Sequence, residues 1–252
     1  MKKFIKYPGF SSLLFLLVIF TSCEQNAAEI LENSIVATGS NELNGKTITF
    51  DFRDKSYTAT RKDGLYTLER FQTDTSGTVI RDVLYNDGFF REIDGKKVVL
   101  PDSMVVKYSN SVNSVHYFAV LPYGLQDKAV NKSLIGEVTI AEIPYYKIKV
   151  WFDQDGGGKD FEDTFVYWVN KNNNKIDYLA YGYNTDGGGL RFREAYNRRN
   201  VGGVDFVDYL NYKTDDLSIP VSSLDSLYEK QELKLLSKIE LQDVQVSPCS
   251  GC

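Results

Sequence analysis

The sequence predicts a mainly β protein of the α+β class, with a strongly curved antiparallel sheet or incomplete β-barrel, an N-terminal helix and inserted helices. From Gly45 onward, short segments alternate apolar and polar residues, which is typical of strands with one buried face. Turn sequences such as Asp63-Gly64 and Asp94-Gly95 separate these segments, and strands joined by such tight turns are antiparallel neighbours. A sheet of many strands must curl, close or stack to bury one face.

Residues 1–22 have the pattern of a cleaved signal peptide. A basic start precedes the apolar run from Ser11 to Phe20, which is far shorter than the ~20 residues of a membrane-spanning helix. Phe20-Thr21-Ser22-Cys23 then resembles the lipobox of bacterial lipoproteins, although family examples usually carry Leu where this chain has Phe20. The resemblance implies that Cys23 is acylated and becomes the first residue. A plain signal peptide with an incidental cysteine is the alternative.

A lipidated Cys23 predicts both a location and a surface charge. Two or more acyl chains anchor a protein stably, whereas one chain binds only marginally. We expect a lipid-anchored protein of a Gram-negative cell envelope, and of the outer membrane because no Asp follows Cys23. Removing residues 1–22 takes away three lysines and no acid, so the formal net charge changes from −5 to −8. An acidic surface argues against nucleic acid as a partner.

Residues 23–252 are expected to form a single domain with a short Cys-x-x-Cys tail, because no Pro/Gly/Ser-rich linker interrupts them. In an oxidising envelope, Cys249 and Cys252 most simply form a local disulfide. A redox or metal-capture tail is the alternative. However, no βαβ pattern surrounds the motif, and two thiolates make up only half of a tetrahedral zinc site.

The first half of the domain is predicted to be a helix followed by a meander of hairpins. Residues 24–38 are expected to be helical, since Ala27, Ile30, Leu31 and Ile35 fall on one face and Gly39 ends the pattern. Five strand segments follow: KTITFDFRD (46–54), SYTATRKDG (56–64), LYTLERFQTD (65–74), GTVIRDVLYNDG (77–88) and FFREIDGKKVVL (89–100).

The second half is predicted to be an inserted helical segment followed by a second meander. Residues 101–125 break the alternation, which indicates one helix or two short helices that end at Leu121-Pro122. A short helix is expected within 222–233. The expected strands are YYKIKVWFD (145–153), TFVYWVNK (164–171), KIDYLAYGY (175–183), LRFREAYN (190–197), VDFVDYLNYKT (204–214) and a last strand LKLLSKIELQDVQV (233–246).

Aromatic residues make up 13% of the chain and are frequent at the alternating apolar positions of the second meander. Broad apolar faces of this kind suit either a packed core or the lining of an apolar cavity, and the pattern does not separate the two. The candidates for a cavity lining are Phe118, Tyr146, Ile148, Val150, Phe165 and Tyr167.

Acidic residues crowd a glycine-rich turn at residues 153–163, DQDGGGKDFED. Calcium takes six to eight oxygen ligands, so Asp153, Asp155 and Asp160 are weak calcium candidates. The EF-hand spacing fails, because the twelfth position is Thr164 and cannot supply a bidentate carboxylate. A hairpin turn kept soluble by its acids explains the same residues.

No catalytic or cofactor-binding motif is present in the sequence. The chain has one histidine, His116, whose apolar neighbours indicate a hydrogen-bonded structural group, and it has no Gly-x-Ser-x-Gly elbow. No Walker loop or Gly-x-Gly-x-x-Gly follows a strand, so nucleotide binding is unsupported. Asp205 and Asp208 are a carboxylate pair of the kind that glycosidases use, but such pairs are common on polar strand faces.

The order of the elements carries a family resemblance. The helix AAEILENSIVATGS, the meander FDFRDKSYTATRKDGLYTLER and the passage YNDGFFREIDGKKVVLPDS into a helix are similar to the periplasmic lipoprotein-carrier fold. HYFAVLPYGLQD, LIGEVTIAEIPYYKIKVWF and VYWVNKNNNKIDYL look like an uncharacterised family of envelope lipoproteins with this layout. The resemblance implies a half-open barrel around a helical lid and an apolar cavity. None of the carriers' functional residues can be matched here.

Three functions are therefore compatible with the sequence. The first is a lipid-anchored module that binds an apolar or acyl-bearing ligand in the cavity, without catalysis or a cofactor. The second is an envelope protein-interaction or structural lipoprotein whose core is filled by its own side chains. The third is a hydrolase that works through carboxylates. An open cavity favours the first, a solid core the second, and a cleft with two carboxylates of raised pKa the third.

Overall fold

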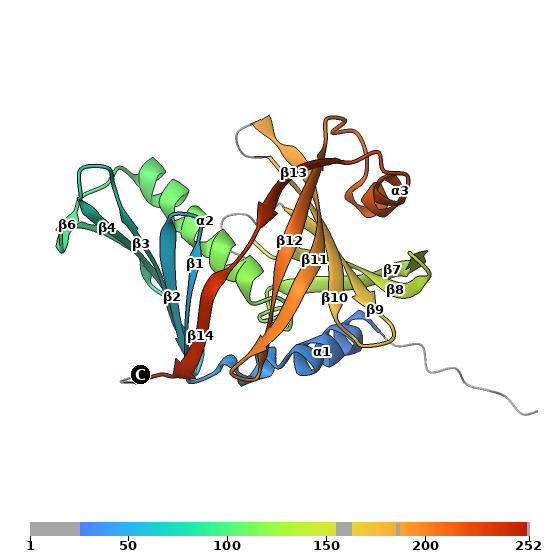
Figure 1. Cartoon of the computed structure of the whole chain (residues 1–252), viewed down its shortest axis with the longest axis horizontal. Helices are drawn as coiled ribbons and strands as arrows, with labels where there is room; N and C mark the ends of the chain where they lie inside the picture. The colour runs from blue at the N-terminus through green and yellow to red at the C-terminus, as the bar shows by residue number, and fades with distance from the viewer. Residues whose placement is uncertain (1–25, 155–162, 185–186, 251–252) are drawn as a thin grey trace, which may run out of the picture.

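The computed structural model describes residues 26–154, 163–184 and 187–250, which form two seven-stranded antiparallel sheets with helices between and around them (Figure 1). The first sheet has the order β14-β1-β2-β3-β4-β5-β6, and the second has the order β13-β12-β11-β10-β9-β8-β7. The two sheets do not close into a barrel over the described residues. The predicted fold class, an open and curved antiparallel β structure with an N-terminal helix and inserted helices, is confirmed.

The strands of the first sheet are β1 (Lys46–Phe52), β2 (Lys55–Lys62), β3 (Leu65–Thr73), β4 (Val79–Tyr85), β5 (Gly88–Ile93), β6 (Lys96–Val98) and β14 (Gln242–Pro248). Those of the second sheet are β7 (Val130–Ile140), β8 (Ile143–Phe152), β9 (Thr164–Asn170), β10 (Ile176–Tyr183), β11 (Gly189–Val201), β12 (Val204–Thr214) and β13 (Lys234–Ile239). The helices are α1 (Ala27–Thr38), α2 (Asp102–Ala119) and α3 (Leu224–Glu229), with short 3-10 turns η1 (Ser40–Leu43) and η3 (Val221–Ser223).

Helix α1 is capped at both ends, and it ends at Gly39 as predicted. The Asn26 side chain accepts a hydrogen bond from the Glu29 backbone N–H at 3.0 Å, which caps the start of the helix. Gly39 ends it in the left-handed conformation, with φ of 68°. Residues 24 and 25 of the predicted helix lie outside the described residues. The segment 101–125 contains one long helix, α2, rather than two short ones.

The predicted last strand, 233–246, is two strands that belong to different sheets. β13 pairs with β12 in the second sheet, whereas β14 pairs with β1 in the first. The break lies at Leu241, whose N–H donates to the Asp208 carboxylate at 3.0 Å and whose carbonyl accepts from the Arg199 guanidinium. Hydrogen bonds to side chains thus take the place of backbone hydrogen bonds to a neighbouring strand, so the chain can cross between the sheets at Leu241.

The structure differs from the predicted strands in two other places. The predicted strand 89–100 is divided into β5 and β6 by the turn at Asp94-Gly95. Strand β7 was not predicted from its own sequence, VNKSLIGEVTI. Its pairing with β8 shifts register between Leu134 and Gly136, and a bulge of this kind interrupts the alternation on which the prediction depends.

The second sheet is covered on both of its faces. On its inner face, Ile30 and Leu31 of α1 pack with residues of β8, β9, β10 and β12. On its outer face, Trp168 and Phe192 pack with Leu224 at the start of α3. Burial on both faces explains why six of the seven residues of β9 are buried, which is unusual for an antiparallel strand.

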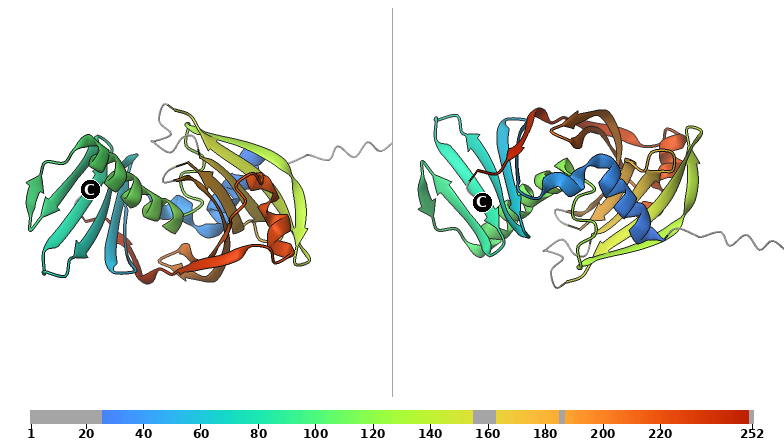
Figure 2. Two further views of the ribbon diagram at one scale, coloured as in Figure 1. Left: turned by 90° about the horizontal axis from the view of Figure 1, so that it is seen from above. Right: turned by 90° about the horizontal axis from the view of Figure 1, so that it is seen from below.

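Helix α2 runs diagonally from the first sheet to the second (Figures 1 and 2). Its buried residues Val112 and Ala119 pack in a core with Phe50 and Leu68 of the first sheet. Its last turns reach the second sheet, where the Tyr117 and Tyr167 hydroxyls form a hydrogen bond. Among the described residues, no helix combines the length and the apolar character that crossing a membrane requires.

Candidate ligand cavity

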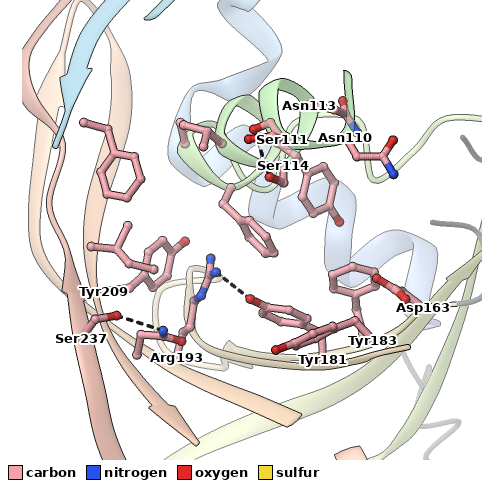
Figure 3. A pocket seen from close by; sticks show the side chains of 18 of the residues that line it. Asn110, Ser111, Asn113, Ser114, Asp163, Tyr181, Tyr183, Arg193, Tyr209 and Ser237 are labelled. Atoms are coloured by element: carbon pink, nitrogen blue, oxygen red, sulfur yellow. Dashed lines mark hydrogen bonds between the residues drawn. The ribbon is translucent and has the colours of Figure 1, made fainter. Parts of the chain in front are cut away.

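An open cavity of about 770 Å³ lies between α2 and the inner face of the second sheet (Figure 3). Small-molecule sites have volumes of about 300–1,000 Å³, so the cavity has the size of a binding site. Most of its walls come from α2 and from strands β8 to β13, and the end of β1 adds Phe52 and Arg53. Its aromatic lining residues are Phe52, Tyr117, Phe118, Phe152, Phe165, Tyr181, Tyr183 and Tyr209.

The aromatic wall is held by ring–ring contacts. Phe165 stacks against Tyr181 with centroids 5.6 Å apart and meets Phe152 edge-on at 5.7 Å. Phe118 contacts Tyr117 edge-on at 5.2 Å and lies 5.3 Å from Tyr181. Such pairs are each worth about 0.5–1.5 kcal/mol beyond their buried area, so they stabilise this arrangement of the wall.

Strand alternation and helix periodicity explain why these rings face the cavity. Phe165 and Tyr181 are direct cross-strand partners on β9 and β10, so their side chains lie on the same face. On α2, Ser103, Val106, Asn110, Ser114, Tyr117 and Phe118 recur at three- and four-residue intervals and line the cavity. The opposite stripe of α2 packs on the first sheet, so the two faces of this helix have different surroundings.

A buried arginine lies among the rings. The Arg193 side chain reaches from β11 into the middle of the cavity, with Tyr181 and Tyr209 on either side (Figure 3). Its Nη2 donates to the Tyr181 hydroxyl at 2.7 Å, and its guanidinium lies 3.9 Å from the centre of the Phe118 ring. Burial raises the pKa of Tyr209 to about 12, against the opposing effect of the Arg193 charge. Tyr209 is therefore a neutral hydrogen-bonding group at physiological pH.

The part of the cavity wall formed by residues 103–114 of α2 is mainly polar. Exposed lining residues of this helix are Ser103, Lys107, Ser111, Asn113 and Ser114, and the exposed Arg53 lies at the end of β1. An aromatic floor with a polar, exposed rim is the arrangement expected of a site that accepts an apolar molecule from water.

The predicted lining residues separate into two groups. Phe118 and Phe165 line the cavity. Ile148, Val150 and Tyr167 are fully buried in the core that α1 covers, and Tyr146 packs against the edge of that core. None of these four contributes to the lining. The reason is that α1 packs in the same core and covers this part of the inner face.

Arg193, Tyr181 and Asn211 line the cavity and were not predicted to do so. The sequence feature that could have identified Arg193 is its position in LRFREAYN. Arg193 falls on the same strand face as Ala195, and Ala195 packs against the core of the inner face. That signal is ambiguous in sequence, since the same alternation also places Arg191 on this face.

The calcium, cysteine and lipid predictions fall largely outside the described residues. Asp153 accepts a hydrogen bond from Asn131 at 2.6 Å, whereas Asp155 and Asp160 lie outside the described residues. Within the described ranges, no three His, Cys, Asp or Glu residues are grouped to hold a metal ion. Cys249 takes part in a disulfide. Cys252, its predicted partner, and Cys23, the predicted lipidation site, lie outside the described residues.

The remaining titratable candidates are structural groups away from the cavity. His116 is buried, and its Nε2 forms a hydrogen bond with the Glu69 carbonyl at 3.0 Å, as predicted for a structural histidine. Burial alone would raise the pKa of Asp205, but hydrogen bonds from Lys175 and Asn200 hold it below its usual value. Asp208 pairs with Arg199 at 3.1 Å. Neither carboxylate lines the cavity, so they do not form a catalytic pair there.

Comparison with solved structures finds several proteins of low sequence identity that are similar over most of this chain. A LolA superfamily protein from Nitrosomonas europaea is 11% identical, with a TM-score of 0.46 over 88% of this chain and 92% of that one. A putative outer-membrane lipoprotein-sorting protein domain from Vibrio parahaemolyticus is 7% identical, with a TM-score of 0.42 over 81% of this chain and 98% of that one.

A DUF1329 family protein from Desulfovibrio piger is 11% identical, with a TM-score of 0.42 over 81% of this chain and 99% of that one. No curated protein sequence matches the chain significantly. The family model of DUF6503, described as a family of unknown function, matches residues 10–241.

Proposed function

The chain belongs to DUF6503, a family of unknown function, and we propose that it binds an apolar or acyl-bearing ligand in the cavity between α2 and the second sheet. The observation that carries the proposal is the aromatic wall. Tyr117, Phe118, Phe152 and Tyr181 are only partly buried, and the surface that they leave uncovered lines a cavity of about 770 Å³. Apolar surface of this extent on a preformed concave wall supports ligand binding.

The energetics favour a chain-like apolar ligand. Each methylene group buried from water contributes about 0.8 kcal/mol, so an acyl chain laid along the rings gains free energy along its length. The rings already contact one another, so little conformational entropy is lost when the ligand binds. The open cavity supports this function over that of an interaction protein with a filled core.

We further propose that the protein acts at a membrane, anchored by lipid on Cys23 in the cell envelope, on the outer membrane. The support is the sequence pattern Phe20-Thr21-Ser22-Cys23 after a short apolar run. A ligand of the cavity would then come from, or be delivered to, that membrane or a protein partner within the envelope.

The cavity proposal is tested with a neutral apolar dye, Nile red, and the purified full chain. The wild type is expected to bind the dye, and Ser114→Trp is expected to weaken binding at least tenfold by filling the rim from the exposed side of α2. Val99→Trp is the matched control, because Val99 is fully exposed and does not line the cavity. Equal binding by Ser114→Trp and Val99→Trp, or no binding by the wild type, would refute the proposal.

The anchor proposal is tested by Cys23→Ser in the native envelope. The variant is expected to leave the membrane fraction and to lose the mass of the acyl chains from its N-terminus. A variant that stays membrane-bound and is processed like the wild type would show that Cys23 is not the anchor.

A further inference from the structure

Arg193 is a buried cation without a counter-ion in the part of the chain that the structure describes. Its exposed fraction is 7%, and no Asp or Glu of these residues pairs with it. Arg70 and Arg91, which are buried to a similar extent, both pair with Asp82. Arg61 is also buried without a carboxylate and, like Arg193, lies against an aromatic ring, but it does not line the cavity. A buried charge is costly unless it is paired, so Arg193 needs an explanation.

Two cavity-lining residues with unsatisfied polar atoms are neighbours on the second sheet. The Nε of Arg193 and the Oδ1 of Asn211 are buried and have no hydrogen-bond partner. The two residues are direct partners on β11 and β12, so both side chains project from the same place on the sheet. Both residues line the cavity. Two unpartnered polar groups at one position of an otherwise aromatic wall indicate a ligand group that completes them.

The available donors match an anionic group. The Nε–H of Arg193 is available as a donor. The Tyr181 hydroxyl accepts a hydrogen bond from Arg193 Nη2, so the proton of that hydroxyl is free to be donated to a ligand. The Asn211 amide nitrogen donates to the Ser237 hydroxyl at 3.1 Å. Since a hydroxyl can also donate, the amide can turn over, accept from Ser237 and direct an N–H into the cavity. Guanidinium with neighbouring neutral donors is the usual environment of a bound carboxylate or phosphate.

The lining residues carry a net positive charge, which also favours an anionic ligand. Among the described lining residues, Arg53, Lys107 and Arg193 are cationic, and Asp163 is the one acid. The whole chain, in contrast, has a formal net charge of −5. A cationic cavity in an acidic protein selects for anionic ligands and against cationic ones.

We propose that the ligand of this cavity is an acyl-bearing amphiphile whose anionic group, a carboxylate or a phosphate, pairs with Arg193. The inference rests on the proposed function, since it identifies the chemical class of the molecule that the cavity binds. The acyl chain lies along the aromatic wall. Tyr181 and Asn211 complete the shell around the anion and orient it against the guanidinium.

The first test compares ligands on the wild-type full chain by displacement of Nile red. Palmitate is expected to bind at least about tenfold more tightly than hexadecanol, which has the same chain without the charge, because hydrogen bonds to a charged group are worth about 1.5–3 kcal/mol. Equal affinities would overturn the assignment of Arg193 while leaving the cavity proposal intact. If neither the dye nor either ligand binds, the cavity proposal itself fails.

The second test removes the charge. Arg193→Met keeps an unbranched side chain but no cation, so palmitate is expected to fall to within about twofold of hexadecanol, whose own affinity should not change. Arg193→Lys keeps the charge and is expected to retain most of the preference. If Arg193→Met lowers the affinities for palmitate and hexadecanol to the same extent, Arg193 maintains the shape of the cavity and does not bind the anionic group. The ligand comparison on the wild type does not depend on how well the variants fold.

The source of the anion is distinguished by a third ligand, lysophosphatidic acid with one palmitoyl chain. Tighter binding than palmitate that is lost in Arg193→Met would identify a phosphate, as in a lipid headgroup. Weaker binding than palmitate would identify a carboxylate, as in a free fatty acid.

Discussion

At the scale of single residues, a buried charge cluster joins α2 to the first sheet. Asp82 accepts a hydrogen bond from Arg70 Nη2 at 2.6 Å and another from Arg91 Nε at 2.6 Å. Arg70 also donates to Ser111 of α2 at 2.7 Å, and the Arg91 guanidinium lies 3.5 Å from the centre of the Tyr108 ring. The cluster thus positions the helix that forms one wall of the cavity.

Replacing the carboxylate of this cluster should be strongly destabilising. Asp82→Ala leaves two buried guanidinium groups without a counter-charge, so we expect the free energy of unfolding to fall by about 3–5 kcal/mol. Urea denaturation measures the change. Asp54→Ala is the control, because its ion pair with Lys55 lies at the surface and should contribute nothing measurable. A similar loss in both variants would contradict the role of Asp82.

The buried His116 is predicted to make the stability of the fold depend on pH. Burial, together with the charges of Arg61 and Arg70, lowers its pKa to about 3, against the hydrogen bond to the Glu69 carbonyl. The unfolded chain, in which a histidine has a pKa near 6.5, therefore binds the extra proton first as the pH falls. Stability is complete above pH ~6.5 and is lost progressively between pH ~6.5 and 3.

Because the chain has one histidine, a single substitution removes the histidine contribution to the pH dependence of stability. Between pH 7 and 5 we expect the wild type to lose about 2 kcal/mol of unfolding free energy through His116. His116→Gln should not show this loss. Urea unfolding of both proteins at the two pH values provides the comparison. If the variant loses as much stability as the wild type, His116 does not carry the pH dependence.

At the scale of elements, the end of α1 is fitted against the turn between β11 and β12. Gly39 has a φ of 68°, which glycine adopts without strain, and a Cβ there would lie 2.0 Å from the Gly203 carbonyl oxygen. The close approach brings α1 against the sheet, where Ile30 and Leu31 are buried. Gly39 thus serves both as the helix C-cap and as a packing contact.

Two glycine substitutions separate these roles. Gly45→Ala should cost about 1–2 kcal/mol, because Gly45 has a φ of 70° but no neighbour within 4 Å of a Cβ. Gly39→Ala should cost a further ~1–3 kcal/mol, since the backbone carbonyl of Gly203 must move away. The midpoints of urea unfolding measure both. Equal shifts would show that the contact between α1 and the β11–β12 turn is not tight.

At the scale of the whole molecule, one core joins the two sheets. Val204 and Phe206 of β12 in the second sheet pack with Ile48 and Phe50 of β1 in the first. The chain itself crosses from β13 to β14 between the sheets. A shared core and a shared strand connection are the conditions under which two sheets unfold together.

We therefore predict one cooperative unfolding transition. Both tryptophans, Trp151 and Trp168, lie in the second sheet. Their fluorescence reports on that sheet, whereas far-ultraviolet circular dichroism reports on both. The two signals should coincide in urea, and Phe206→Ala should shift them together by about 3–5 kcal/mol. A dichroism transition in two phases, with fluorescence following one of them, would show that the sheets unfold independently.

Local structure and fold class follow from the amino-acid sequence. Alternation and turn residues predicted most strands, and the cap residues of α1 predicted its end at Gly39. The predicted order, helix then meander, inserted helix and second meander, is that of the structure. These features depend on neighbouring residues, and local interactions are what a sequence pattern records.

Which apolar faces are covered and which line the cavity depends on long-range packing. Ile148 and Phe165 are equivalent in pattern, yet α1 covers the first while the second borders the cavity. Likewise, 233–246 reads as one strand, but Leu241 is bound by Asp208 and Arg199 and the chain changes sheets there. The physical reason is the same in each case: the partner that satisfies a side chain or backbone group comes from a distant part of the chain.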